Sequence, residues 1–167
     1  QSMLLTLPEG IDRDKLVRVL QVILDHHHAL RLTLSEDGQL TIPEQGTVSA
    51  ADCLHLAEDQ PTEGPKLAAV MDRAASGLDP RSGRLLQAVW FPERRRLMLT
   101  IHHLAVDGVS WRILLPDLAQ AWAAVAEGRE PALTPAPTSL RDWAAALPAL
   151  AVRRRHELPL WQEMDAG

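Results

Sequence analysis

The chain has only one cysteine in its 167 residues, Cys53, and this excludes an internal disulfide. Domains without disulfides are typical of reducing compartments, so we expect a cytoplasmic protein in which Cys53 is a small apolar filler. Positively charged residues are also outnumbered by acidic ones. The formal net charge is −5, which argues against nucleic acid as a partner, because phosphate backbones are bound through an excess of Lys and Arg.

Long apolar runs are absent as well. No segment approaches the roughly 18 consecutive apolar residues of a membrane span, and no signal peptide is visible, so a membrane is not an expected partner. The initiator Met is missing too. The chain opens with QSMLLTL, already the pattern of a strand, and we expect a piece of a longer polypeptide. Its length suits about one domain with a sizeable core.

The sequence shows neither an internal repeat nor a strict alternation of strand and helix. Period-2 patterns and turn residues predict strands at 2–7, 29–34, 39–42, 53–56, 84–91 and 95–103. Apolar stripes and capping residues predict helices at 13–27, 62–76, 109–126, 138–147 and, with a break at Pro159, 151–164. We therefore predict an α/β fold in which helices pack on one face of a mixed β-sheet.

Ionisable groups concentrate in TIHHLAVDGVSWRILLPDL, residues 100–118, at a predicted strand-to-helix turn. His102 and His103 are adjacent on a strand, so their side chains point to opposite faces. One ring then faces the core and the other a cleft, and periodicity alone does not say which. An imidazole can accept or donate a proton near neutral pH, which makes this pair a candidate for acid–base chemistry.

The residues after the histidines suggest how such a site is built. Gly108 is expected to permit a tight turn after Asp107, and the helix that follows would aim its N-terminal amides back at the histidines. Amides in that position stabilise developing negative charge. A plainer interpretation makes Asp107 the N-cap of the helix.

Two rival chemistries have weaker support. A metal site would combine His26, His27 and His28 with His102 and His103, but neither a Cys pair nor an HExxH spacing is present, and adjacent histidines on a helix point apart. We expect no metal. A Ser–His hydrolase acting through Ser110 lacks the GxSxG elbow.

The segment HHLAVDG, residues 102–108, resembles the HHxxxDG signature of the condensation-domain superfamily of nonribosomal peptide synthetases. Three further segments are similar to the epimerization subfamily: VDGVSWRILLPDL at 106–118, PTSLRDWA at 137–144 and ELPLW at 157–161. HHHALRLTL at 26–34 resembles the family segment HHDALRLRF, with a histidine in place of the usual acid. The resemblance covers essentially the whole chain.

The resemblance implies a two-lobed fold like that of chloramphenicol acetyltransferase, with residues 1–167 as the N-terminal lobe and the C-terminal lobe absent. It implies that His103 is the catalytic residue facing a tunnel between the lobes and that His102 supports it. It further implies a buried ion pair between Arg31 and Asp107, next to Gly108. Ser110 and Trp111 are candidates for the tunnel wall.

The implied reaction is inversion at Cα, from L to D, of an aminoacyl or peptidyl thioester. The thioester is carried on the 4′-phosphopantetheine arm of a peptidyl carrier protein, so no cofactor is bound directly. A Glu of the absent lobe would share the proton transfer, and the fragment alone is expected to be inactive. Two alternatives stay open: a condensation domain that forms peptide bonds, and a non-catalytic lobe that serves as a docking platform.

Overall fold

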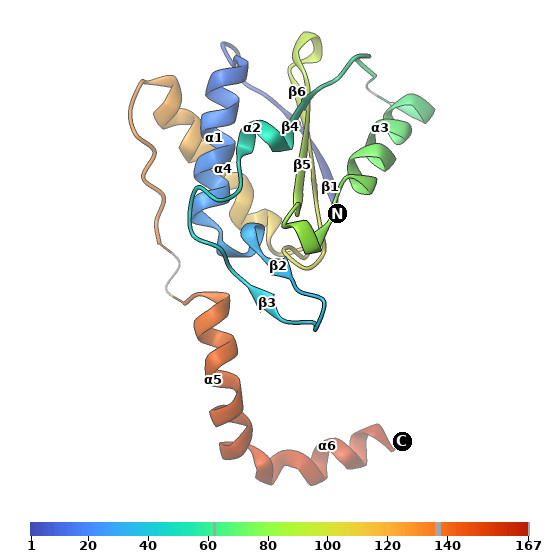
Figure 1. Ribbon diagram of the computed structural model, residues 1–167, viewed down its shortest axis with the longest axis vertical. Helices are drawn as coiled ribbons and strands as arrows, with labels where there is room; N and C mark the ends of the chain where they lie inside the picture. The colour runs from blue at the N-terminus through green and yellow to red at the C-terminus, as the bar shows by residue number, and fades with distance from the viewer. Residues whose placement is uncertain (62, 136–137, 167) are drawn as a thin grey trace. The chain divides into compact units, whose positions relative to one another are not determined.

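The computed structural model describes residues 1–61, 63–135 and 138–166 (Figure 1). The chain divides into two compact units, residues 1–134 and 135–167. The first unit contains both sheets and the helices that cover them, and the second contains helices alone.

The first unit is organised around a four-stranded sheet. Its strands, in spatial order, are β1 (Ser2–Thr6), β6 (Arg96–Ile101), β5 (Leu86–Phe91) and β4 (Leu54–Leu56). β6 runs antiparallel to both of its neighbours, whereas β4 runs parallel to β5. The sheet is therefore mixed, as predicted, and β6 is one of its two central strands.

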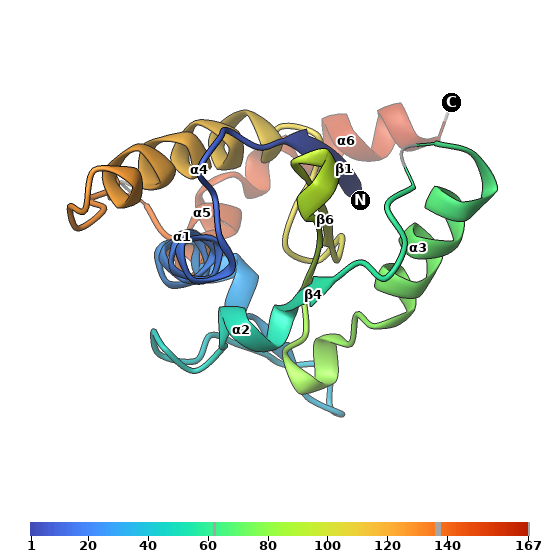
Figure 2. The ribbon, with the colours of Figure 1, turned by 90° about the horizontal axis from the view of Figure 1, so that it is seen from above.

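Helices cover both faces of this sheet. α1 (Arg13–His26) and α4 (Trp111–Ala126) pack against each other on one side, and the short α2 (Ala50–Cys53) lies next to α1. α3 (Gly64–Ser76) lies on the other side of the sheet, as Figure 2 shows from above. The prediction that helices cover only one face is thus wrong.

The strand sequences explain why two covers are needed. On β6, Leu97, Leu99 and Ile101 join the core formed with α1 and α4. The intervening Met98 joins a second core with Phe91 of β5, against which α3 packs. A strand that is apolar on both faces must be covered on both, because either bare face would expose that apolar surface to water.

The predicted hairpin around residues 92–94 is confirmed. A 3₁₀ turn at Pro92–Arg94 joins β5 to β6, and Arg95 completes it with a positive φ of 49°. The other predicted hairpin is shorter than expected, with only β2 (Thr33–Leu34) and β3 (Leu40–Thr41) paired in a separate sheet. The preceding residues His28–Arg31 form a 3₁₀ turn instead of a strand.

Cys53 ends α2 as a buried residue of the main core. Burial, with the neighbouring charge of Asp52, raises the pKa of its thiol to about 11. The thiol is therefore protonated and unreactive at neutral pH, in keeping with the predicted role as a filler.

The second unit contains α5 (Leu140–Arg153) and α6 (Leu158–Asp165), joined through a 3₁₀ turn at Arg155–Glu157. The helix break therefore precedes Pro159 instead of coinciding with it. Pro159 lies in the first turn of α6, where the N–H that proline lacks has no intrahelical partner anyway. Among the described residues, no helix combines the length and apolarity needed to cross a bilayer.

Candidate functional site

The candidate site lies at the end of β6, where residues 102–110 lead into α4 (Figure 1). The strand is held there from both sides. The amide of Ile101 donates to the carbonyl of Gln1 at 2.8 Å, and the amide of His102 donates to the carbonyl of Leu85 at 2.8 Å. The two histidines thus leave the sheet from a backbone that hydrogen bonds fix on both sides.

The two histidine rings have different surroundings. His102 is half-buried, and its Nδ1 accepts a hydrogen bond from the amide of Leu104 at 3.1 Å. Its carbonyl accepts from the amide of Ala105 at 3.0 Å, which closes a tight turn. His103 is exposed. His102 is therefore tied into the loop, and the ring of His103 is open to solvent.

A residue that sequence reasoning missed contacts the exposed histidine. Gln1 places its Nε2 at 3.2 Å from Nε2 of His103 and accepts a hydrogen bond from Nε1 of Trp111 at 2.9 Å through its Oε1. Trp111 itself is only 7% exposed and belongs to the main core. No local pattern marks Gln1, because the pairing of β1 with β6 brings it to the site from 102 residues away.

Asp107 is exposed and organises the loop locally. Its Oδ1 accepts from the amides of Val109 at 3.0 Å and Ser110 at 2.9 Å, and from the hydroxyl of Ser110 at 2.8 Å. These bonds, the Ser110 hydroxyl first, lower the pKa of Asp107, so its carboxylate is ionised at neutral pH. Ser110 is the N-cap residue of α4, so Asp107 stabilises the turn before the helix rather than capping the helix itself.

Four amides near the start of α4 are already bonded. The amides of Val109 and Ser110 donate to the carboxylate of Asp107. The amides of Arg112 and Ile113 donate to backbone carbonyls one turn back. For these four amides, the prediction that they point at the histidines is therefore wrong. For the amide of Trp111, the first residue of α4, it stays a prediction. The Ser110 hydroxyl is likewise engaged with Asp107, and the Trp111 indole with Gln1.

Arg31 does not reach Asp107, and the predicted ion pair is wrong. Arg31 is 2% exposed, and its guanidinium donates to the carbonyls of Leu24 at 2.5 Å, Asp25 at 2.7 Å and Pro43 at 3.2 Å. The last carbonyls of a helix have no intrahelical donor, and the negative end of the helix dipole attracts a cation. Arg31 therefore stabilises the end of α1.

Gly108 does not have the conformation expected of it. Its φ lies outside the left-handed region, and a Cβ built on it meets nothing within 4 Å. The turn after Asp107 therefore does not require glycine. The absent side chain leaves open space in the same loop as His103.

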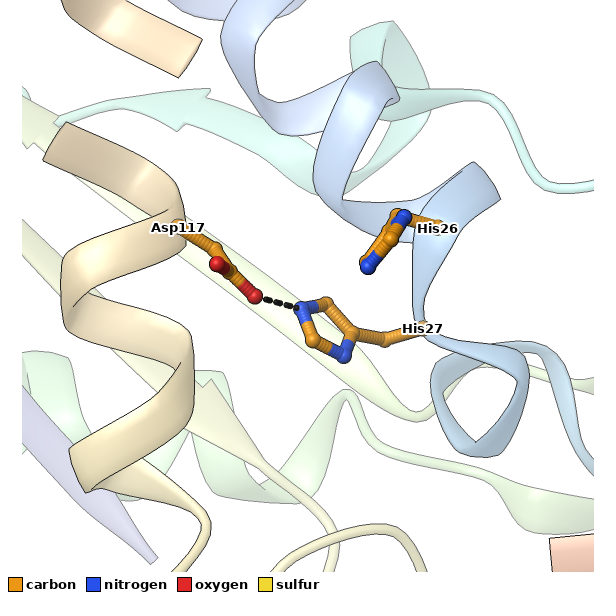
Figure 3. A group of neighbouring side chains, drawn as sticks. All are labelled: His26, His27 and Asp117. Carbon is orange, nitrogen blue, oxygen red and sulfur yellow. Dashed lines mark ion pairs between the residues drawn. The ribbon is translucent and has the colours of Figure 1, made fainter. Parts of the chain in front are cut away.

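Apart from the histidine loop, a cluster of ionisable residues lies where α1 ends next to α4 (Figure 3). The ligand atoms of His26, His27 and Asp117 are all within 4.8 Å of one another, the one set of three among the described residues that could hold a metal ion. His28, His102 and His103 are not part of it. Nε2 of His27 lies 2.9 Å from Oδ2 of Asp117. Two ligands each about 2 Å from a tetrahedral zinc are about 3.3 Å apart, so this spacing fits a direct contact better.

Burial is the main influence on the pKa of His27. Together with the nearby charges of His26 and His28, it lowers the pKa of His27, and the attraction of Asp117 only partly opposes this. The ring is therefore neutral in the folded protein near neutral pH. It links the end of α1 to the middle of α4.

The condensation domain family matches residues 1–164. Tyrocidine synthase 1 from Brevibacillus parabrevis is 30% identical over 99% of this chain but only 16% of its own length. Surfactin synthase subunit 1 from Bacillus subtilis strain 168 is 30% identical over 99% of this chain and 5% of its own. The chain thus spans a small part of these relatives.

Solved structures show the same fold. The epimerization domain from the third module of tyrocidine synthetase B superimposes with a TM-score of 0.81 and 27% identity, covering 99% of this chain and 39% of that one. The X-domain from teicoplanin biosynthesis gives a TM-score of 0.74 at 24% identity, covering 93% of this chain and 34% of that one.

The contacts of Arg31 and Asp107 predict that the two residues act independently. Arg31→Met leaves carbonyls of α1 without donors and should lower the free energy of unfolding by about 2–4 kcal/mol. Asp107→Asn should give a smaller loss, and the two losses should add in the double variant, as measured by urea unfolding. If the double variant were no less stable than Arg31→Met, the two residues would be coupled, and the predicted ion pair would be supported after all.

Gly108→Ala should be tolerated. With a permissive φ and open space around the new methyl group, we expect a change in Tm of no more than about 2 °C. Gly83→Ala is the matched control. Its φ is +76°, and the new Cβ would lie 3.0 Å from Cγ2 of Thr33, so it should melt clearly lower. The reverse order of melting temperatures would contradict the loop geometry.

His27 should contribute a pH-dependent term to stability. In the unfolded chain its pKa is about 6.5, so the unfolded state takes up a proton that the folded state resists. The free energy of unfolding should therefore fall as the pH drops from about 7 through that value towards the lowered folded pKa. His27→Gln should flatten this slope, whereas His28→Gln, which removes only a minor influence on the pKa of His27, should flatten it much less. The free energy of unfolding is measured by chemical denaturation at each pH. If its slope against pH were the same for His27→Gln and the parent, His27 would not be the source of the pH dependence.

Proposed function

Because this chain belongs to the condensation-domain family, we propose that it is part of an epimerization domain of a nonribosomal peptide synthetase. The observation that carries the proposal is the similarity of 99% of this chain to part of the epimerization domain of tyrocidine synthetase B. The likeness to the X-domain, at 24% identity, supports only the fold. The residues that follow the histidine motif, Val109 to Leu114, favour the same subfamily.

The proposed substrate is an aminoacyl or peptidyl thioester on the phosphopantetheine arm of a carrier protein. A base removes the proton from Cα, and the electron pair moves into the thioester carbonyl to form an enolate. A proton is then returned to the opposite face of the carbon. The net reaction is inversion at Cα, with no change in oxidation state.

His103 is the proposed acid–base residue, since its ring is exposed and it lies two residues beyond the fixed end of β6. His102 is the proposed supporting residue, since its Nδ1 is engaged with the amide of Leu104. Because the chain spans 39% of the epimerization domain it resembles, the second proton-transfer group, a Glu, is proposed to lie in the remainder.

A condensation domain is the second candidate, because the matching family is described by that activity. The same histidine would then assist an amine that attacks a carrier-bound thioester. The two candidates differ in the fate of the Cα proton. Only epimerization requires its exchange with solvent while the thioester stays intact.

His103→Ala should lower Cα exchange by about 10²-fold or more when this chain is joined to the rest of its domain. His102→Ala should act mainly by lowering Tm, since it removes a hydrogen bond that holds the loop. The measurement is deuterium uptake at Cα of an aminoacyl carrier protein in D₂O. Residues 1–167 alone should give no uptake.

Each part of that prediction has its own contrary result. Uptake by His103→Ala equal to that of the parent would remove His103 from the mechanism. Peptide-bond formation without Cα exchange would favour the condensation domain. Robust exchange by residues 1–167 alone would mean that the second half of the site is not needed.

A further inference from the structure

We infer that Gln1 is a positioning residue that keeps Nε2 of His103 unprotonated, with Trp111 as its anchor. The inference deepens the proposed function, on which its catalytic meaning rests. Its physical content is a hydrogen-bond relay from the core to the site: Trp111 Nε1 to Gln1 Oε1 at 2.9 Å, then Gln1 Nε2 to His103 Nε2 at 3.2 Å.

The chemistry of the three groups fixes the direction of the relay. An indole N–H only donates, so the amide atom that faces Trp111 must be the carbonyl oxygen of Gln1. This contact settles the orientation of the amide, which distances alone do not. The NH₂ group is then the part that faces His103. Since NH₂ only donates, Nε2 of His103 must accept, and the neutral ring carries its proton on Nδ1.

The anchor is rigid enough to impose this choice. Trp111 is 7% exposed and packs in the core with residues of α1 and the sheet. The backbone of Gln1 is fixed by the hydrogen bond from the amide of Ile101, and the next residue, Ser2, pairs with Thr100 both in register and through their hydroxyls at 3.0 Å. Only the ring of His103 remains free to adjust.

His102 has the opposite arrangement. Its Nδ1 accepts from the amide of Leu104, so the proton of a neutral His102 ring lies on Nε2. The two neighbouring histidines are therefore held in different tautomers by different partners. For the proposed reaction, Gln1 sets the tautomer before the substrate binds. Nε2 of His103 then carries no proton when the substrate displaces the Gln1 amide, and it is the atom that receives the Cα proton.

The direct test is the tautomer of His103 by long-range ¹H–¹⁵N correlation in ¹⁵N-labelled chain, whose ring nitrogens report separately whether each carries a proton. The chain is expressed with residues preceding Gln1, so that its nitrogen remains part of a peptide bond. Spectra are taken at about pH 8, well above the ordinary imidazole pKa. The His103 signals among the seven histidines are identified by their loss in His103→Gln.

The parent should show His103 with the proton on Nδ1 and a bare Nε2. Gln1→Glu should move the proton to Nε2, because a carboxylate only accepts and one of its oxygens stays with Trp111. Gln1→Met and Trp111→Phe should each give a mixture of the two tautomers. His55 lies away from the site, and its Nε2 is 2.6 Å from Oε1 of Gln87. Its ring should keep its signals in every variant and so report an intact sheet.

A protonated Nε2 in the parent, or unchanged His103 signals in Gln1→Glu with those of His55 intact, would overturn the inference. A second measurement separates it from the proposed function. Within the full domain, Gln1→Glu should lower Cα exchange at least tenfold, since the wrong tautomer presents an N–H to the substrate. If the tautomers behave as expected but the parent domain exchanges no Cα proton, the proposed function fails and the positioning role stands.

Discussion

The pairing of β1 with β6 is the constraint on which the candidate site depends. β6 has to be held on both edges for its last residues to have a fixed direction, and β1 provides the edge that β5 does not. Without it, the amide of Ile101 would lose its partner just before the two histidines. The same pairing carries Gln1 to His103 and Trp111, so the strand that completes the sheet also completes the surroundings of the site.

Local patterns were enough to predict much of the fold. The apolar stripe of α1, the hairpin of β5 and β6 and the long helix α4 each depend on residues close together in sequence, and all are present. The second helical layer was missed because the buried strands of an α/β sheet read as continuous apolar runs, which do not say how many faces are covered. Met98, between Leu97 and Leu99, belongs to the face beneath α3.

The side-chain partners at the site were much harder to predict. The pairing of Arg31 with Asp107 was inferred from resemblance, but each residue has nearer groups to bond. Arg31 lies just beyond a helix whose terminal carbonyls need donors. Asp107 lies three residues before Ser110, and its carboxylate accepts hydrogen bonds from the amide and the hydroxyl of that serine. The contacts of His27 with Asp117 and of Gln1 with His103 join distant segments, and only the folded chain brings them together.

The ionised carboxylate of Asp107 has a consequence for where charge can develop during a reaction. It places a permanent negative charge in the loop that carries His103 and occupies two amides that could have held an anion. An amide that already donates to a carboxylate cannot also hold the oxygen of an enolate. In the proposed reaction, the donors for that oxygen must therefore be groups other than the amides of Val109 and Ser110.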